Sequence, residues 1–461
     1  MKITRPKPMT ASKSEALTGN VRIPGDKSIS HRALMFGALA KGETMVSGLL
    51  EAGDVFSTAE ALRSMGVRLS NQDGLWRIHG GNGLGEPANI IDMGNSGTST
   101  RLLAGMIAGY DITATLTGDA SLIKRPMARI MTPLTEMGAT FMSRSGSRLP
   151  MSMRGSSSLR GIEYRLPVAS AQVKSCILLA GLNASGSTTV IEDTPTRDHT
   201  ETMLCGFGVE VTTETLGDGA QAITLKGGQM LKGCAIDVPG DPSTAAFPTI
   251  AALMVPGSEL VLPHITMNPR RNGLYVTLLE MGADIKMEHE RLEGGEPIAD
   301  LRIRYNGPLK GITVPPERIA SMIDEVPALA MVCACANGTS HLTNLGELRV
   351  KESDRLKMVA DGLVACGVKL EMGEESLTIH GTGKAPKGGA TIQTALDHRI
   401  AMSFLCLGFA SEAPVTIDDI SPVMTSFPSF VETMTGLGAQ LAASDEVALD
   451  PDGLFLKQTA Q

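Results

Sequence analysis

Basic and small polar residues cluster at the predicted start of a helix near the beginning of the sequence. Lys27, Ser28 and Arg32 precede or open the apolar run at 33–40, which predicts a helix that either Asp26 or Ser28 can cap. Backbone N–H groups and the positive end of the helix dipole favour an anion at such a position. A lysine, a serine hydroxyl and an arginine at this point therefore indicate a binding site for a phosphate or carboxylate group.

Similar groups recur at further predicted turns in the first half of the sequence. Gly97 lies in the turn Asn95–Thr98, where the missing Cβ lets a ligand approach the backbone closely. Arg125 is stiffened by the proline that follows it, and it is a candidate for binding an anion. The hydrogen-bonding side chains of Ser170–Gln172 suit hydroxyls and a phosphate, and Arg197 opens another helix within reach of an anion.

The second half of the sequence places carboxylates beside cations. Asp324 stands before an apolar helical run, and Arg399 stands at the start of another. Lys351 and Arg355 are four residues apart and would share one face of a helix, with Glu352 three residues before Arg355. Carboxylates at such positions are candidates for general acid–base chemistry.

Each cluster taken alone also fits a structural explanation. Polar helix caps are common, and the run 349–355 would ordinarily be an exposed, salt-bridged helix face. Arg101 is more typical of a cation that packs along a helix than of a ligand-binding residue. His199 and Glu201 are equally compatible with the surface.

The clusters belong to a repeat that occurs six times. Each unit reads as a short strand such as Val21–Ile23, a turn of small residues, an apolar helix, and a second helix that ends in a hydrophobic residue and a glycine before another strand. The six glycines are Gly66, Gly138, Gly208, Gly282, Gly367 and Gly438. Repeats this long determine the architecture, so we expect an α/β protein with two domains of about 200 residues each.

Composition argues against several functions. The net charge of −8 argues against a general nucleic-acid surface, so cations for an anionic ligand must gather locally. The seven cysteines lack zinc-ligand spacing and predict buried free thiols in a reducing cytosol. There is no P-loop or Gly-x-Gly-x-x-Gly turn, so no ATP or dinucleotide is indicated. The first 18 residues are expected to form a soluble tail, and no apolar run is long enough for a membrane span.

Taken together, these motifs resemble those of the 5-enolpyruvylshikimate-3-phosphate (EPSP) synthase family, the 3-phosphoshikimate 1-carboxyvinyltransferases. The similarity extends from about Gly19 to about Gly438 and rests on Gly25–Ser28, Gly94–Thr98, Lys124–Met127, Ser170–Gln172, Arg349–Arg355 and Asp397–Arg399. The resemblance implies an inside-out α/β barrel fold of two similar lobes, each of three βαβαββ units. Lobe 1 would comprise residues 1–22 and 238–461, and lobe 2 residues 23–237.

The resemblance also implies a reaction and its residues. The enolpyruvyl group of phosphoenolpyruvate would move to the 5-hydroxyl of shikimate 3-phosphate through a tetrahedral intermediate, with no metal and no organic cofactor. Shikimate 3-phosphate would be bound by Lys27, Ser28, Arg32, Ser170, Ala171, Gln172, Arg197, Asp324 and Lys351. Phosphoenolpyruvate would be bound by Lys27, Asn95, Gly97, Arg125, Gln172, Arg355 and Arg399.

Proton transfer needs a base for the hydroxyl and an acid for the methylene carbon of phosphoenolpyruvate. By resemblance, Asp324 is the candidate base, and it should ionise readily beside cations. The candidate proton donor is Glu352 or Lys27. For Glu352 to donate a proton, its pKa should be raised by burial.

The sequence departs from the family pattern at informative positions. Its motifs look like a divergent second class known for glyphosate tolerance, yet Gly97 replaces the alanine of the best-known tolerant members, and Arg270 replaces a threonine. Thr425-Ser426 stand before Phe427-Pro428, where many members carry a lysine. Because glyphosate mimics phosphoenolpyruvate and Gly97 leaves it room, we expect glyphosate to inhibit.

Two alternatives stay open. One is an enolpyruvyl transferase acting on UDP-N-acetylglucosamine, although Ser28 stands after Lys27 where that enzyme has an asparagine. The other is a non-catalytic protein that binds phosphorylated metabolites on the same scaffold. We expect a cytoplasmic monomer that binds small molecules and neither nucleic acid nor membrane.

Overall fold

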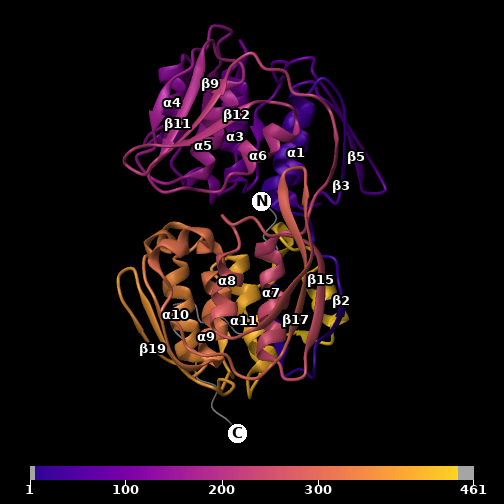
Figure 1. Cartoon of the computed structure of the whole chain (residues 1–461), viewed down its shortest axis with the longest axis vertical. Helices are drawn as coiled ribbons and strands as arrows, with labels where there is room; N and C mark the ends of the chain where they lie inside the picture. The colour runs from indigo at the N-terminus through magenta and orange to yellow at the C-terminus, as the bar shows by residue number, and fades with distance from the viewer. Residues whose placement is uncertain (1–5, 445–461) are drawn as a thin grey trace.

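Two large hydrophobic cores organise the chain, stacked along its long axis (Figure 1). The computed structural model describes residues 6–444. One core, in the upper half of Figure 1, runs from Ile29 to Val238 and defines lobe 2. The other comprises Ala11, Leu17 and Ile23 together with buried residues between 245 and 439, and it defines lobe 1.

Each lobe contains six helices among the described residues. Those of lobe 2 are α1 (Lys27–Leu39), α2 (Gly53–Ser64), α3 (Gly97–Ala108), α4 (Ala128–Met137), α5 (Ala171–Gly181) and α6 (His199–Gly206). Those of lobe 1 are α7 (Pro242–Met254), α8 (Gly273–Glu280), α9 (Val326–Cys335), α10 (Arg355–Ala365), α11 (His398–Ala410) and α12 (Phe430–Gly436). The odd-numbered helices form the lobe interiors; α7, for example, is buried along its whole length, as its apolar sequence requires.

The sheets of lobe 2 share one strand order. They are β14-β3-β5-β4, β6-β7-β9-β8 and β10-β11-β13-β12. Their strands are β3 (Gly42–Ser47), β4 (Arg68–Gln72), β5 (Leu75–Gly80), β6 (Ile91–Asp92), β7 (Thr113–Thr117), β8 (Thr140–Arg144), β9 (Arg148–Arg154), β10 (Glu163–Arg165), β11 (Ser187–Glu192), β12 (Val211–Thr215), β13 (Gln221–Lys226) and β14 (Ala235–Asp237). In each sheet the first pair is parallel and the others are antiparallel.

Lobe 1 repeats this pattern in β2-β15-β17-β16, β18-β20-β19 and β21-β22-β1-β23. Its strands are β1 (Met9–Ser12), β2 (Thr18–Asn20), β15 (Glu259–Thr266), β16 (Asp284–Glu293), β17 (Glu296–Arg304), β18 (Asn337–Leu342), β19 (Lys369–Met372), β20 (Leu377–Thr382), β21 (Thr391–Ile392), β22 (Val415–Ile417) and β23 (Gln440–Ala443). Five 3-10 turns complete the assignment: η1 (Leu122–Lys124), η2 (Pro316–Ser321), η3 (Ile323–Glu325), η4 (Gly346–Val350) and η5 (Ser421–Thr425).

The sixfold repeat predicted from the sequence is confirmed by its glycines. All six follow the even-numbered helices and have φ between +84° and +121°. A side chain is disfavoured in this left-handed region, so glycine ends each helix and turns the chain into the next strand.

The two lobes exchange their leading strands. β2 precedes α1 but pairs with β15, which follows α7, whereas β14 precedes α7 but pairs with β3, which follows α1. The predicted strand at Val21–Ile23 is therefore wrong: the strand ends at Asn20, and the next residues cross between lobes. The two crossing segments lie side by side, because Gly25 and Gly240 form an antiparallel bridge.

The expectation of a tail over the first 18 residues is also wrong for the described part. β1 lies between β22 and β23 and completes the sixth sheet, which lacks a closing strand from its own unit. None of the helices in the region 6–444 is long and apolar enough to cross a membrane. All seven cysteines are free, but Cys205 is exposed rather than buried.

A buried histidine links the first three helices of lobe 2. Nδ1 of His31 lies 2.8 Å from Oγ1 of Thr58 and 3.1 Å from Oγ of Ser99. Burial lowers the pKa of His31 to about 3, from 6.5. Below pH 6.5 the unfolded chain takes up a proton that the folded chain refuses until about pH 3, so stability falls as the pH falls through this window.

We therefore expect His31 to remove about 2 kcal/mol of unfolding free energy between pH 8 and pH 5. Denaturant unfolding at both pH values measures this loss, and His31→Gln should reduce it by that amount. Substitution of the half-exposed His79 by glutamine is the matched control. An equal pH dependence in wild type and His31→Gln would contradict the assignment.

Candidate active site

The odd-numbered helices begin on the facing sides of the two lobes, and the predicted site residues lie at these helix starts. Lys27 is the first residue of α1, Gly97 of α3 and Ala171 of α5. Asp324 lies in η3 just before α9, and Arg399 is the second residue of α11. The helices are capped by polar side chains, namely Asp26, Ser96, Ser170, Asp241 and Asp397.

Asp324 is the point at which the two lobes meet. Its Oδ2 accepts a hydrogen bond of 2.7 Å from Arg197 of lobe 2, and its Oδ1 lies 3.1 Å from Nη1 of Arg355 and 3.5 Å from Nζ of Lys351. Arg399 donates to the Asp324 backbone carbonyl at 2.9 Å. Burial alone would raise the pKa of Asp324, but these four cations hold it well below its usual range. Asp324 is therefore ionised at neutral pH, as a base must be.

Glu352 does not have the raised pKa predicted for a proton donor. Burial does favour its neutral form, but Nη2 of Arg355 lies 2.6 Å from its Oε2. This arginine, with His398 and Arg125, outweighs burial and lowers the Glu352 pKa to about 2. That expectation was wrong because it counted burial without the cation three residues away.

The helix predicted to carry both Lys351 and Arg355 is interrupted. η4 ends at Val350, Lys351 is extended, and α10 begins at Arg355 behind its cap Asp354. The two cations nevertheless meet at Asp324, because the break directs Lys351 back toward it. Arg355 is 1% exposed and also donates to Asp397 at 2.8 Å.

On the lobe 2 side, α1 presents Lys27 and Ser28. Nζ of Lys27 lies 3.0 Å from Asp54, a residue at the start of α2 that sequence reasoning missed. Arg32 is buried and donates to Thr200 and to Ser175, both at 2.8 Å, and to the Ser28 carbonyl at 2.9 Å. Arg32 thus fixes Ser28 and contributes positive potential from behind it.

A second group of lobe 2 residues surrounds the start of α3. Arg125 donates to Asn95 at 3.1 Å, and Arg101 donates to Oε1 of Gln172 at 2.5 Å. A Cβ added at Gly97 would lie 3.1 Å from guanidinium nitrogens of both arginines. Arg101, expected only to pack along its helix, therefore also orients Gln172.

His199 and Glu201, for which a surface position was open, are buried. His199 reaches Glu296 at 2.7 Å, where the β16–β17 hairpin of lobe 1 rises toward α6 (Figure 1). Glu201 pairs with Lys174 at 2.7 Å behind α5. No sequence periodicity distinguishes these partners, since α6 is short and its neighbours come from distant segments.

A cavity of about 330 Å³ lies behind Arg197 and away from Lys27 and Asp324. Its lining includes Glu201, Cys205 and Arg270. It contains none of the predicted site residues. The chemistry indicated by the sequence therefore belongs to the interface between lobes around Asp324, where the cations gather, and not to this cavity.

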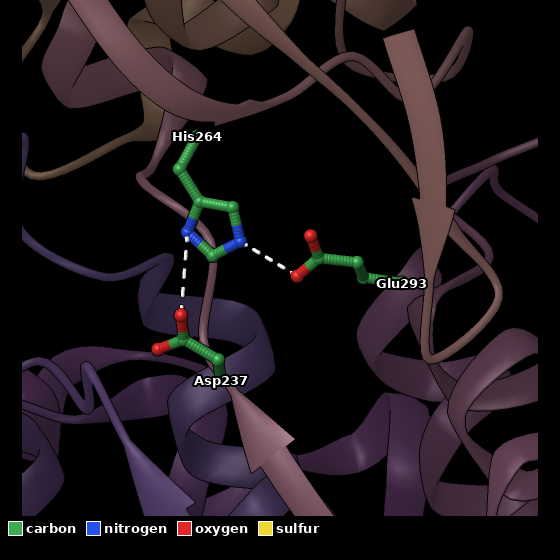
Figure 2. Close-up of side chains that lie close together, drawn as sticks. All are labelled: Asp237, His264 and Glu293. Carbon is green, nitrogen blue, oxygen red and sulfur yellow. Dashed lines mark hydrogen bonds and ion pairs between the residues drawn. The ribbon is translucent and has the colours of Figure 1, made fainter. Parts of the chain in front are cut away.

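Asp237, His264 and Glu293 form a separate cluster at the crossing between lobes (Figure 2). Nε2 of His264 lies 2.8 Å from Glu293, and Nδ1 lies 3.8 Å from Asp237, so the carboxylates flank opposite ring nitrogens. Arg22 already pairs with Asp237 at 2.8 Å, and Arg291 with Glu293 at 2.6 Å. This geometry fits an ion-pair cluster better than three ligands converging on one metal ion.

The comparisons agree with this fold and site. A family profile described as EPSP synthase (3-phosphoshikimate 1-carboxyvinyltransferase) matches residues 11–434. A relative named 3-phosphoshikimate 1-carboxyvinyltransferase from Cereibacter sphaeroides is 56% identical, covering 95% of this chain and 98% of the relative. Another of that name, from Paramagnetospirillum magneticum, is 54% identical over 95% of this chain and 99% of the relative.

Solved structures give the same result. A structure of EPSP synthase from Acinetobacter baumannii superposes with a TM-score of 0.87 at 45% identity, covering 95% of this chain and all of that one. The fold and site define an enolpyruvyl-transferring α/β enzyme of two lobes. The chain belongs to the EPSP synthase family.

Proposed function

We propose that the interface around Asp324 binds shikimate 3-phosphate and phosphoenolpyruvate side by side and transfers the enolpyruvyl group to the 5-hydroxyl. The observation that carries this is the gathering of Lys27, Arg125, Arg197, Arg355 and Arg399 around facing helix starts in a chain of net charge −8. Two phosphates and two carboxylates in one cleft need such a local excess of positive charge.

Shikimate 3-phosphate is assigned to lobe 2 together with the Asp324 region. The proposed contacts are Lys27, Ser28, Arg32, Ser170, Ala171, Gln172, Arg197, Asp324 and Lys351. In support, the start of α5 presents backbone N–H groups beside Ser170 and Gln172, and Arg197 and Lys351 both already reach Asp324. The role of Arg32 is indirect, through Ser28, because its guanidinium is occupied by protein groups.

Phosphoenolpyruvate is assigned to the groups around the starts of α1, α3 and α11. The proposed contacts are Lys27, Asn95, Gly97, Arg125, Gln172, Arg355 and Arg399. Arg125 and Arg355 lie on opposite lobes and both act on Glu352. A small dianion between them would neutralise both guanidinium groups.

The chemistry follows from these positions as addition and elimination. Asp324 accepts the proton of the 5-hydroxyl while its oxygen forms a bond to C2 of phosphoenolpyruvate, and a proton is delivered to C3. The tetrahedral intermediate then loses phosphate from C2 and a proton from C3. Because Glu352 is held ionised, we assign the proton delivery to Lys27, whose ammonium group carries its protons at neutral pH.

Phosphate release from phosphoenolpyruvate tests the proposed function. We expect release only when shikimate 3-phosphate is present, with one phosphate formed per acceptor consumed. Release with UDP-N-acetylglucosamine instead would support the other enolpyruvyl transferase. Tight binding of both ligands without release would support a non-catalytic binding protein.

Glyphosate should inhibit by occupying the phosphoenolpyruvate position, and Gly97→Ala should weaken this inhibition. The added methyl would lie 3.1 Å from Nη1 of both Arg101 and Arg125, so these side chains must shift by a few tenths of an ångström. We expect the inhibition constant to rise more than the KM for phosphoenolpyruvate, because the inhibitor is the longer molecule. Steady-state kinetics measure both, and equal increases would contradict this prediction.

We further propose that one chain suffices for activity, in lobes comprising 1–22 with 238–461 and 23–237. The single chain supplies residues from both walls of the site, as the Arg197–Asp324 pair illustrates. Seven free thiols suit a reducing compartment, so we place the enzyme in the cytoplasm.

A further inference from the structure

Arg271 occupies the crossing between the lobes, directly behind the facing helix starts. It lies between β15 and α8 of lobe 1, and its side chain is 2% exposed. Nη1 donates to Oδ2 of Asp26 at 3.1 Å, and Nη2 donates to Oδ1 of Asp241 at 3.0 Å. One guanidinium group thus contacts a carboxylate from each lobe.

These two carboxylates are the caps of equivalent helices. Asp26 accepts from the Ile29 amide at 2.9 Å and caps α1, which begins with Lys27 and Ser28. Asp241 accepts from the Ser243 amide at 2.8 Å and caps α7. The backbones of the two caps also cross-pair, because the Asp26 amide donates to the Pro239 carbonyl at 2.7 Å.

The same guanidinium group reaches two further parts of the site. Nη2 donates to Oγ of Ser243 at 2.8 Å, and that hydroxyl donates to Glu325, the residue after Asp324. Nη1 lies 3.2 Å from Nε2 of His199, the first residue of α6, two residues after Arg197. Since an arginine can only donate, Nε2 accepts, and the proton on Nδ1 faces Glu296 at 2.7 Å.

We propose that Arg271 is a positioning residue that sets Lys27 of lobe 2 against Asp324 of lobe 1. It fixes α1 through Asp26 and fixes the Asp324 segment through Ser243 and Glu325. This inference rests on the proposed function, because it takes Lys27 and Asp324 as the groups that act on the reacting atoms. A lysine cannot replace the planar fork, because one ammonium group cannot reach both caps, Ser243 and His199 together.

The test compares Arg271→Lys with wild type in the phosphate-release assay and in calorimetric titration with shikimate 3-phosphate alone. We expect kcat to fall about 100-fold, since a misplacement of about 1 Å between catalytic groups costs that much. The dissociation constant for shikimate 3-phosphate should change less than about threefold, because Ser170 and Gln172 do not contact Arg271. The matched control is Arg22→Gln, which removes an exposed ion pair with Asp237 at the same crossing and should leave kcat unchanged.

A triple variant separates positioning from stability. Arg271→Met with Asp26→Asn and Asp241→Asn removes all three buried charges while asparagine still caps both helices. We expect its melting temperature to approach that of wild type while kcat stays low. Recovery of kcat in the triple variant, or a kcat for Arg271→Lys within threefold of wild type, would overturn the proposal. Absence of turnover in wild type would instead contradict the proposed function.

Discussion

Asp324→Asn should lower kcat by roughly 10²- to 10⁴-fold, the usual contribution of a general base. Asparagine has a similar shape and keeps a carbonyl oxygen for Arg197, Lys351 or Arg355, but it cannot accept the hydroxyl proton. Binding of shikimate 3-phosphate should not weaken, because the surrounding cations lose a competing carboxylate and remain available to the phosphate. Phosphate release and calorimetric titration measure the two quantities separately.

The matched control for this substitution is Asp361→Asn on α10. Asp361 is exposed and pairs only with Lys357 among its described partners, so its loss should leave kcat unchanged. If Asp324→Asn keeps more than a tenth of the wild-type kcat while the control is normal, Asp324 is not the base. A parallel loss of shikimate 3-phosphate binding would indicate a binding role instead.

Lys27→Met should be nearly as damaging, with a loss in kcat of about 10²- to 10⁴-fold. The methionine keeps the length and apolar stem but removes the ammonium group, which we assign both to the anions and to protonation of C3. Glu352→Gln should cost less, and the acid limb of its kcat profile should match wild type, because Glu352 is ionised with a pKa of about 2. Profiles of kcat between pH 5 and pH 9 compare the variants.

The opposite ranking would reverse the assignment. If Glu352→Gln removes an ionisation that wild type shows, or costs more than Lys27→Met, then bound substrate anions must raise the Glu352 pKa enough for it to act as the acid. Asp54→Asn offers an internal check, because Asp54 pairs with Lys27 at 3.0 Å without touching the proposed ligands. It should alter kcat far less than Lys27→Met.

The fold was predictable where local chemistry determines it. Glycines such as Gly66 and Gly367 mark helix ends because their left-handed conformation excludes side chains, and Asp26 caps α1 as its sequence position indicated. The exchange of β2 and β14 between lobes was not predictable, because either strand satisfies the local pattern on both sides. The place of β1 in the sixth sheet depends on the absence of another strand, which its own sequence does not record.

The site was predictable as a set of charges but not as a set of pairings. Spacing placed Lys351 and Arg355 on one helix; the chain breaks there, yet both reach Asp324 through tertiary structure. The pKa of Glu352 depends on the balance between burial and Arg355, and only distances decide that balance. Arg271 carries no motif of its own chemistry, because its partners come from three distant segments.

A crystal structure of the chain with shikimate 3-phosphate and glyphosate tests the central claim most directly. We expect shikimate 3-phosphate against the starts of α1 and α5, its 5-hydroxyl within hydrogen-bond distance of Asp324, and the inhibitor between Arg125 and Arg355. Ligands bound instead in the cavity beside Cys205, or a 5-hydroxyl that points away from Asp324, would contradict the account.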